Sequence, residues 1–128
     1  MLSDCTDPYQ QLEVKYKLTR KCLTVLKKHK FPVIIVTKSD LVTRDIDLLK
    51  TSKSVVAITI TTINEDLAKI IEPCAPSPTQ RMNALKCLHQ EKIPVVARID
   101  PIILGLNDNP LEFEKLISNL KSAGVKQI

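Results

Sequence analysis

The feature that most constrains the fold is a run of four β-branched apolar residues followed at once by four polar ones. Residues 33–36 read V-I-I-V and residues 37–40 read T-K-S-D. A continuous apolar run of this kind is typical of a strand buried on both faces, as in a parallel sheet covered by helices. Because burying a lysine is costly, we expect Lys38 to reach solvent or to be held for a ligand or a reaction. The sequence therefore predicts a site at the carboxyl end of this strand.

Two further apolar runs predict strands at residues 54–60 and 93–99. Apolar residues at helical spacing between the runs predict surface helices, the first of them over residues 12–30. Expected helix signals are caps at Thr43, Ser77 and Asn109, a capping box from Thr62 to Glu65, and Gly124 as a left-handed C-terminal residue.

Strands that alternate with helices predict an α/β fold with a parallel sheet of about four to six βα units. Residues 2–5 and 125–128 are interpreted as fragmentary strands at the two ends of this sheet. No linker interrupts the pattern, so residues 1–128 are expected to form one domain. A chain of 128 residues is short for a complete (β/α) barrel, which needs roughly 200 residues or more.

Composition narrows the functional class. The formal net charge is +5, but many of the lysines are scattered over helical segments and no aromatic residues are interleaved with them for base stacking. A solvated helix face is the favoured interpretation, and DNA or another polyanion stays an alternative partner. The four cysteines lie too far apart for a zinc-ligand run and are interpreted as reduced, mostly structural thiols. With no signal peptide and no apolar run of about 18 residues, we expect a cytoplasmic protein without membrane contact.

The ends of the predicted strands gather polar side chains. In parallel sheets, ligands bind at the carboxyl ends of the strands, where loops and helix N-termini meet. These ends carry Thr6, Asp7, the T-K-S-D segment, Thr59, Thr61, Thr62, Arg98 and Asp100. Each residue alone also has an ordinary structural interpretation, such as a helix cap or a strand threonine.

Two chemical alternatives concern Lys38. The segment 37–40 fits the T-K-x-D form of the guanine-specificity motif, but the chain lacks the glycines of a phosphate-binding loop, so nucleotide binding is a minor alternative. A Schiff-base lysine requires a depressed pKa, whereas Asp40 nearby would tend to keep the amine charged.

Several blocks in order resemble the radical S-adenosylmethionine (SAM) proteins related to spore photoproduct lyase. The blocks read T-D-P-Y-Q from residue 6, L-T-R from residue 18, T-K-S-D-L from residue 37 with R-D-I-D-L-L from residue 44, I-T-T from residue 60, E-P from residue 72 with A-P-S-P from residue 75, and P-I-I from residue 101 with G-L-N-D from residue 105. The match covers nearly the whole chain and is therefore more specific than any one block.

The resemblance implies a partial (β/α)6 barrel, similar to a TIM barrel, that binds SAM beside a four-iron cluster and cleaves it to a radical. Carried over by position, Thr6 and Asp7 match a site near the methionine amine, and Lys38 and Ser39 match a site for the methionine carboxylate. The remaining matches are Thr59 and Thr61 for the carboxylate and ribose, and Ile102 and Ile103 for adenine.

The chain also departs from the family's pattern. The C-x-x-x-C-x-x-C loop that holds the cluster lies before the second barrel strand in the family, and the four cysteines here do not replace it. Smaller departures are Gln11, Cys74 and Leu104, where the family has Pro, Gly and Pro. The expectation is the central piece of a lyase-like radical SAM enzyme, inactive by itself and without metal ligands of its own.

The competing hypothesis is a non-catalytic βα domain with a vestigial ligand site. A sheet with an unpaired edge strand exposes backbone hydrogen-bonding groups, so self-association through that edge is expected. The substrate is left open.

Overall fold

A computed structural model describes residues 1–2 and 6–128. Six α-helices, one 3-10 helix and three strands follow one another in these residues. In chain order they are α1 (Glu13–Tyr16), α2 (Leu18–Lys28), β1 (Val33–Thr37), η1 (Asp40–Asp45), α3 (Ile46–Leu49), β2 (Ser54–Thr59), α4 (Glu65–Ile71), α5 (Pro78–Gln90), β3 (Val95–Arg98) and α6 (Pro110–Ser122).

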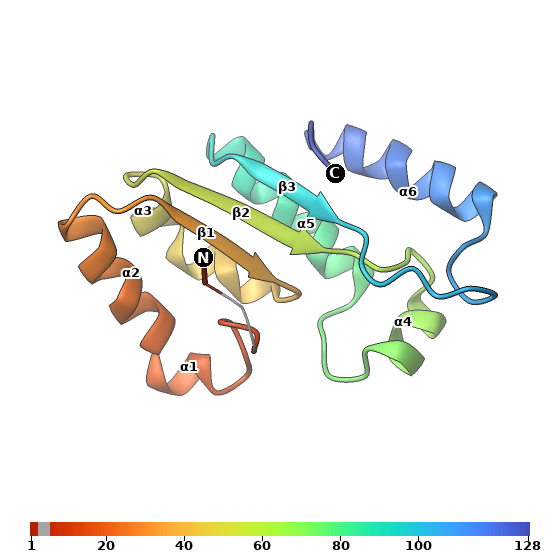
Figure 1. Cartoon of the computed structure of the whole chain (residues 1–128), viewed down its shortest axis with the longest axis horizontal. Helices are drawn as coiled ribbons and strands as arrows, with labels where there is room; N and C mark the ends of the chain where they lie inside the picture. The colour runs from red at the N-terminus through yellow and green to blue at the C-terminus, as the bar shows by residue number, and fades with distance from the viewer. Residues whose placement is uncertain (3–5) are drawn as a thin grey trace.

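The three strands form one parallel sheet in the order β1-β2-β3. Val33 pairs with Ser54, and Val56 pairs with Val95, so the strands run in step and their carboxyl ends lie at the same edge (Figure 1). This arrangement confirms the predicted α/β class and the parallel sheet. The number of βα units and the partial barrel stay predictions.

Segments near both chain ends lie beside the outer strands. The amide of Leu2 donates to Ile34 O at 2.7 Å, and Val36 N donates to Leu2 O at 3.1 Å, as expected for a strand fragment beside β1. At the other edge, Ala97 N donates to Gln127 O at 3.1 Å, although residues 125–128 form no strand. Parts of both sheet edges are therefore already paired.

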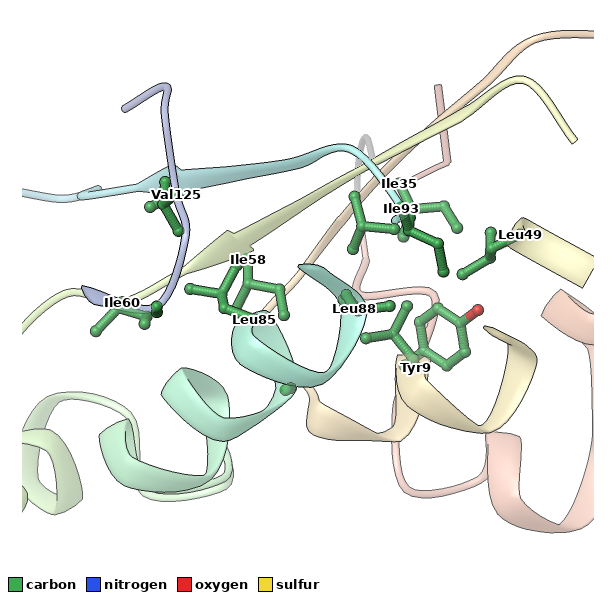
Figure 2. Close-up of a cluster of buried hydrophobic side chains, with 14 of the residues drawn as sticks. Tyr9, Ile35, Leu49, Ile58, Ile60, Leu85, Leu88, Ile93 and Val125 are labelled. Carbon is green, nitrogen blue, oxygen red and sulfur yellow. The ribbon is translucent and has the colours of Figure 1, made fainter. Parts of the chain in front are cut away.

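The core lies between the sheet and the helices on one of its faces, chiefly α3 and α5 (Figures 1 and 2). Side chains at alternate strand positions point toward these helices, as the period of a strand requires. Ile35, Ile58, Leu85 and Leu88 are fully buried there. No helix in the described part of the chain is long and apolar enough to cross a membrane.

The predicted helix over residues 12–30 is wrong at one point, because it is broken at Lys17. This residue has a φ of 52°, in the left-handed region, and separates α1 from α2. The carboxylate of Glu13 reaches across the break and accepts hydrogen bonds from Thr19 N at 3.1 Å and Arg20 N at 3.3 Å. Glu13 thus caps α2 from the preceding helix, which stabilises the break.

Two predicted caps are also wrong. Thr43 lies inside η1, whose N-cap is Ser39, and α3 has no side-chain cap. The N-cap of α4 is Asn64 and not Thr62, because the Asn64 side chain accepts from Asp66 N and Leu67 N. The hydroxyl of Thr62 instead accepts from Asn64 N at 3.0 Å.

The other three helix signals are confirmed. Ser77 and Gln80 form a capping box at the start of α5, and Asn109 accepts from Leu111 N at the start of α6. Gly124 follows α6 with a φ of 87°.

Candidate functional site

A pocket of about 1030 Å³ opens at the carboxyl end of β1. It is bounded by residues 7–14 on one side, residues 38–41 at the strand end, and residues 71–76 with Gln80 on the other. The pocket therefore lies where parallel α/β proteins bind their ligands.

Asp7 is fixed at this pocket by the backbone and side chain of the β1 end. Its Oδ1 accepts hydrogen bonds from Thr37 Oγ1 at 2.6 Å and from Tyr9 N at 2.8 Å. Its Oδ2 accepts from the backbone amide of Lys38 at 2.7 Å. The carboxylate thus keeps one orientation and joins the segment that begins at Thr6 to the end of β1.

Lys38 and Glu72 form an ion pair on the pocket wall. Lys38 Nζ lies 2.7 Å from Glu72 Oε1, which also accepts a hydrogen bond from Thr61 Oγ1 at 2.6 Å. Burial of the Glu72 carboxyl favours a higher pKa, but the contacts from Lys38, Thr61 and Arg81 outweigh burial and lower its pKa. Glu72 is therefore an anion at neutral pH.

Arg81 forms an ion pair with the second oxygen of the Glu72 carboxylate. Its Nη2 lies 2.6 Å from Glu72 Oε2. The two atoms form an ion pair, but their geometry does not meet the criteria of a hydrogen bond. The guanidinium is almost completely buried and is anchored by Nε to Pro76 O at 2.7 Å and by Nη1 to Thr59 O at 3.0 Å. The end of β2 and the start of α5 thus hold Arg81, which in turn holds Glu72.

A second network of charges supports the segment that carries Asp7. Asp45 is fully buried and accepts hydrogen bonds from Tyr9 Oη at 3.1 Å, Arg20 Nη1 at 2.7 Å and Arg44 Nη2 at 2.8 Å. Arg44 also donates to Glu13, both to Oε1 at 2.9 Å and to the carbonyl at 3.0 Å. Figure 2 shows the Tyr9 ring packed among core side chains. This network ties residues 9–20 to η1.

Three of the predicted site residues meet in the pocket, namely Asp7, Lys38 and Ser39. Ser39 is buried, and its Oγ accepts from Leu41 N at 3.2 Å, so it also caps η1. Thr61 does not line the pocket but contacts it through Glu72, and Thr59 contributes its carbonyl to Arg81.

The other predicted site residues lie outside the lining of this pocket. Thr6 is exposed, and Ile102 is 57% exposed. Ile103 is half-buried in a loop fastened by Asn107, whose Oδ1 accepts from Ile103 N at 2.6 Å and whose Nδ2 donates to Thr61 O at 2.9 Å. The structure thus does not bring the expected adenine contacts into the pocket that holds Lys38.

Sequence reasoning missed Glu72, Arg81 and Tyr9 as site residues. Glu72 was noted only as part of the E-P block of the family resemblance, with no contact assigned to it. Its partners lie far away in the sequence, so no local pattern signals the contact.

The residues at the pocket fit a zwitterionic amino-acid group. Lys38 presents a cation for a carboxylate, and Asp7 presents an anion for an ammonium. The fit to an iron–sulfur cluster is different: among residues 1–2 and 6–128, no group of three or more His, Cys, Asp or Glu side chains could hold a metal. Cys22 and Cys74 are exposed and Cys87 is half-buried, unlike the mostly structural thiols expected, and Cys5 lies outside the described residues.

A parallel α/β fold with a charged pocket at its strand ends is an arrangement common to many classes of protein. The family comparison is more specific, since the radical SAM superfamily matches residues 5–120. The chain belongs to the radical SAM superfamily. Superfamily membership implies SAM and a four-iron cluster for the family as a whole.

Curated relatives share the sequence over most of the chain. An uncharacterized protein of Methanocaldococcus jannaschii is 43% identical over 84% of this chain and 41% of its own length. An uncharacterized protein of Acidianus two-tailed virus is 34% identical over 100% of this chain and 44% of its own. An uncharacterized protein of Mycobacterium tuberculosis is 24% identical over 93% of this chain and 36% of its own. The chain thus spans less than half the length of these relatives, and no solved structure matches it.

Proposed function

We propose that the pocket at the end of β1 binds SAM, with Lys38 holding the methionine carboxylate and Asp7 facing the methionine amine. The chain would be the cofactor-binding core of an enzyme of the spore photoproduct lyase-like branch. The observation that carries the proposal is that Asp7 and Lys38, matched by the family resemblance, line one pocket. Inactivity of the chain by itself stays a prediction.

The chemistry of the pocket supports this assignment. A lysine ammonium has three donors, and Glu72 uses one of them at 2.7 Å, so two remain for a carboxylate. Asp7 Oδ2 accepts one backbone hydrogen bond and keeps capacity for a second donor, such as an ammonium. A pocket of about 1030 Å³ also has room for a ligand of the size of SAM. The ribose and adenine contacts, from Thr59, Thr61, Ile102 and Ile103, belong to the proposal on the strength of the resemblance.

Calorimetric titration with SAM tests the assignment. Loss of a hydrogen bond between charged groups costs about 1.5–3 kcal/mol, so we expect Lys38→Ala to weaken SAM binding at least about tenfold. Lys50→Ala is the matched control, because Lys50 also pairs with a glutamate at 2.7 Å but lies outside the pocket lining. Equal affinities of wild type and Lys38→Ala would exclude the role of Lys38. Binding of GTP in place of SAM would favour the alternative that residues 37–40 recognise a guanine nucleotide.

We also propose the second class of function, a non-catalytic domain that acts by self-association. The observation that favours it is Ile34, the second residue of β1, which is 49% exposed on the face opposite the core. Backbone pairing at the outer strands leaves less free edge than the sequence suggested, so the exposed sheet face is the better candidate surface. Binding of DNA or another polyanion stays a prediction from the net charge of +5.

A further inference from the structure

We infer that Glu72, braced by Arg81, is the residue that positions Lys38 for its ligand. The inference rests on the proposed SAM site and concerns how that site is prepared before the ligand arrives. Neither Glu72 nor Arg81 contributes a free charge to the pocket, since each is engaged with the other. Their role is to hold the ammonium of Lys38 at one place on the pocket wall.

Lys38 requires a contact that fixes its conformation, because a lysine side chain is long and flexible. The side chain is 36% exposed, and an exposed lysine samples many rotamers. Fixing it at the moment of binding costs up to about 2 kcal/mol of conformational entropy. A contact that fixes the side chain in the free protein removes that cost from binding, which is preorganisation.

Glu72 can fix the position of Lys38 because its own side chain is fixed by other contacts. Its side chain is only 8% exposed, Thr61 Oγ1 donates to Oε1, and Arg81 lies against Oε2. Arg81 is in turn fixed to two backbone carbonyls, those of Pro76 and Thr59. The position of the Lys38 ammonium is therefore set by the backbone at the end of β2 and the start of α5.

The charges explain why the ion pair with Glu72 does not prevent Lys38 from binding a ligand carboxylate. Lys38 and Arg81 carry two positive charges and Glu72 carries one negative charge, so these three side chains keep a net charge of +1, while Asp7 and Asp40 add two carboxylates elsewhere in the pocket lining. Without Arg81, the pair of Lys38 and Glu72 would be neutral and would attract a carboxylate poorly. With Arg81 present, Lys38 can accept an incoming carboxylate while it stays paired with Glu72.

The test compares the affinities of two ligands for one pair of variants. Glu72→Gln keeps the shape of the side chain and an acceptor oxygen for Thr61, but removes the charge that holds Lys38. Glu91→Gln is the matched control, because Glu91 pairs with Lys50 at the same 2.7 Å on the surface. SAM and 5′-methylthioadenosine are titrated into each, since the second ligand lacks the amino-acid group that Lys38 would meet.

We expect Glu72→Gln to weaken SAM at least about fivefold and to change 5′-methylthioadenosine less than about twofold, with no change for Glu91→Gln. In the Lys38→Ala background, Glu72→Gln should lose this selective effect. An equal loss for both ligands, unchanged SAM binding or tighter SAM binding would overturn the inference. If Glu72→Gln does not fold, Glu72→Asp keeps the charge but withdraws the carboxylate from Lys38, and it must show the same selective loss.

A ligand-free measurement separates this inference from the proposed function. In nitrogen-15 spectra of lysine ammonium groups, we expect the Lys38 signal to be visible in wild type and lost in Glu72→Gln, with Lys38→Ala giving the assignment. A signal that survives in Glu72→Gln overturns the positioning role even if SAM binds. Absence of SAM binding to wild type overturns the proposed function, whatever the spectra show.

Discussion

The imidazole ring of His89, in α5, lies directly against the α-carbon of Gly124, just after α6. A Cβ built on Gly124 would lie 2.2 Å from His89 Cδ2 and 2.5 Å from His89 Cγ. Gly124 also has a φ of 87°, in a region that side chains disfavour. Two separate requirements for glycine therefore meet at one residue, where α6 returns toward α5.

Replacing Gly124 should accordingly cost more than replacing the other glycine of the chain. Gly105→Ala meets only the conformational cost of a φ of 76°, about 1–2 kcal/mol, since a Cβ there has no neighbour within 4 Å. Gly124→Ala must in addition displace the His89 ring, so its thermal unfolding midpoint should be lower than that of Gly105→Ala. Adding His89→Ala to Gly124→Ala should remove the excess. Equal losses in the two single variants would show that the ring moves without cost.

The carboxylate of Asp45 should be among the most sensitive positions in the chain. It is fully buried with Tyr9, Arg20 and Arg44 around it, and removal of one member of a buried ionic group typically costs about 3–5 kcal/mol. We expect such a loss for Asp45→Asn in urea unfolding. Asp47→Asn is the control: this carboxylate pairs with the same Arg20 at 2.7 Å but is largely exposed, so its loss should be much smaller.

Stability should also fall in acid, with Asp45 as one source. Burial favours a higher pKa for Asp45, but hydrogen bonds from Arg44 and Arg20 outweigh it and lower the pKa below its ordinary value of 3.8. A carboxylate with a lowered folded pKa stabilises the protein above its unfolded pKa, and this stabilisation is lost as the pH falls through the folded value. The free energy of unfolding should therefore decrease from about pH 4 downward, and less steeply in Asp45→Asn. Parallel pH profiles for the two proteins would contradict this.

Asn107 should fasten the loop that carries Ile102 and Ile103. Its side chain is buried and donates to Thr61 O at 2.9 Å and Pro101 O at 3.0 Å, while it accepts from Ile103 N. Asn107→Leu leaves these buried groups unpaired, so we expect a loss of about 2–3 kcal/mol and faster amide exchange at Ile103. Asp108→Ala removes only an exposed contact to Gly105 N and should leave the exchange at Ile103 unchanged.

Self-association, if it occurs through the open sheet face, should depend on Ile34. Ile34→Lys places a charge on that face, and sedimentation should then show a monomer at concentrations where wild type associates. Phe31→Lys is the control, because Phe31 is 59% exposed but precedes β1. A wild-type chain that stays monomeric at high concentration would exclude the proposal.

The sequence predicted those features whose causes are local. The capping box of Ser77 and Gln80, the cap at Asn109 and the turn at Gly124 each depend on a few neighbouring residues, and all three are confirmed. Where two local signals compete, the prediction failed: Thr62 and Asn64 can both cap α4, and Asn64 lies at the right distance from the helix start.

The features that the sequence could not predict depend on tertiary contacts. The break at Lys17 has no glycine or proline to announce it and is stabilised by Glu13 through the amides of Thr19 and Arg20. A pocket lies at the strand end where the sequence predicted a site, because the carboxyl ends of parallel strands share one edge. Its supporting charges, Glu72 and Arg81, come from elements whose approach only the folded chain reveals.

Position 38 is held twice, and by different acids: Asp7 binds its backbone amide and Glu72 binds its side chain. Any amino acid except proline supplies the first contact, whereas the second requires a long cation. Substitutions at position 38 can therefore remove the positive charge of the pocket lining without altering the path of the chain around it. A saturation library at this single position would separate ligand affinity from architecture, with proline as the one member expected to damage both.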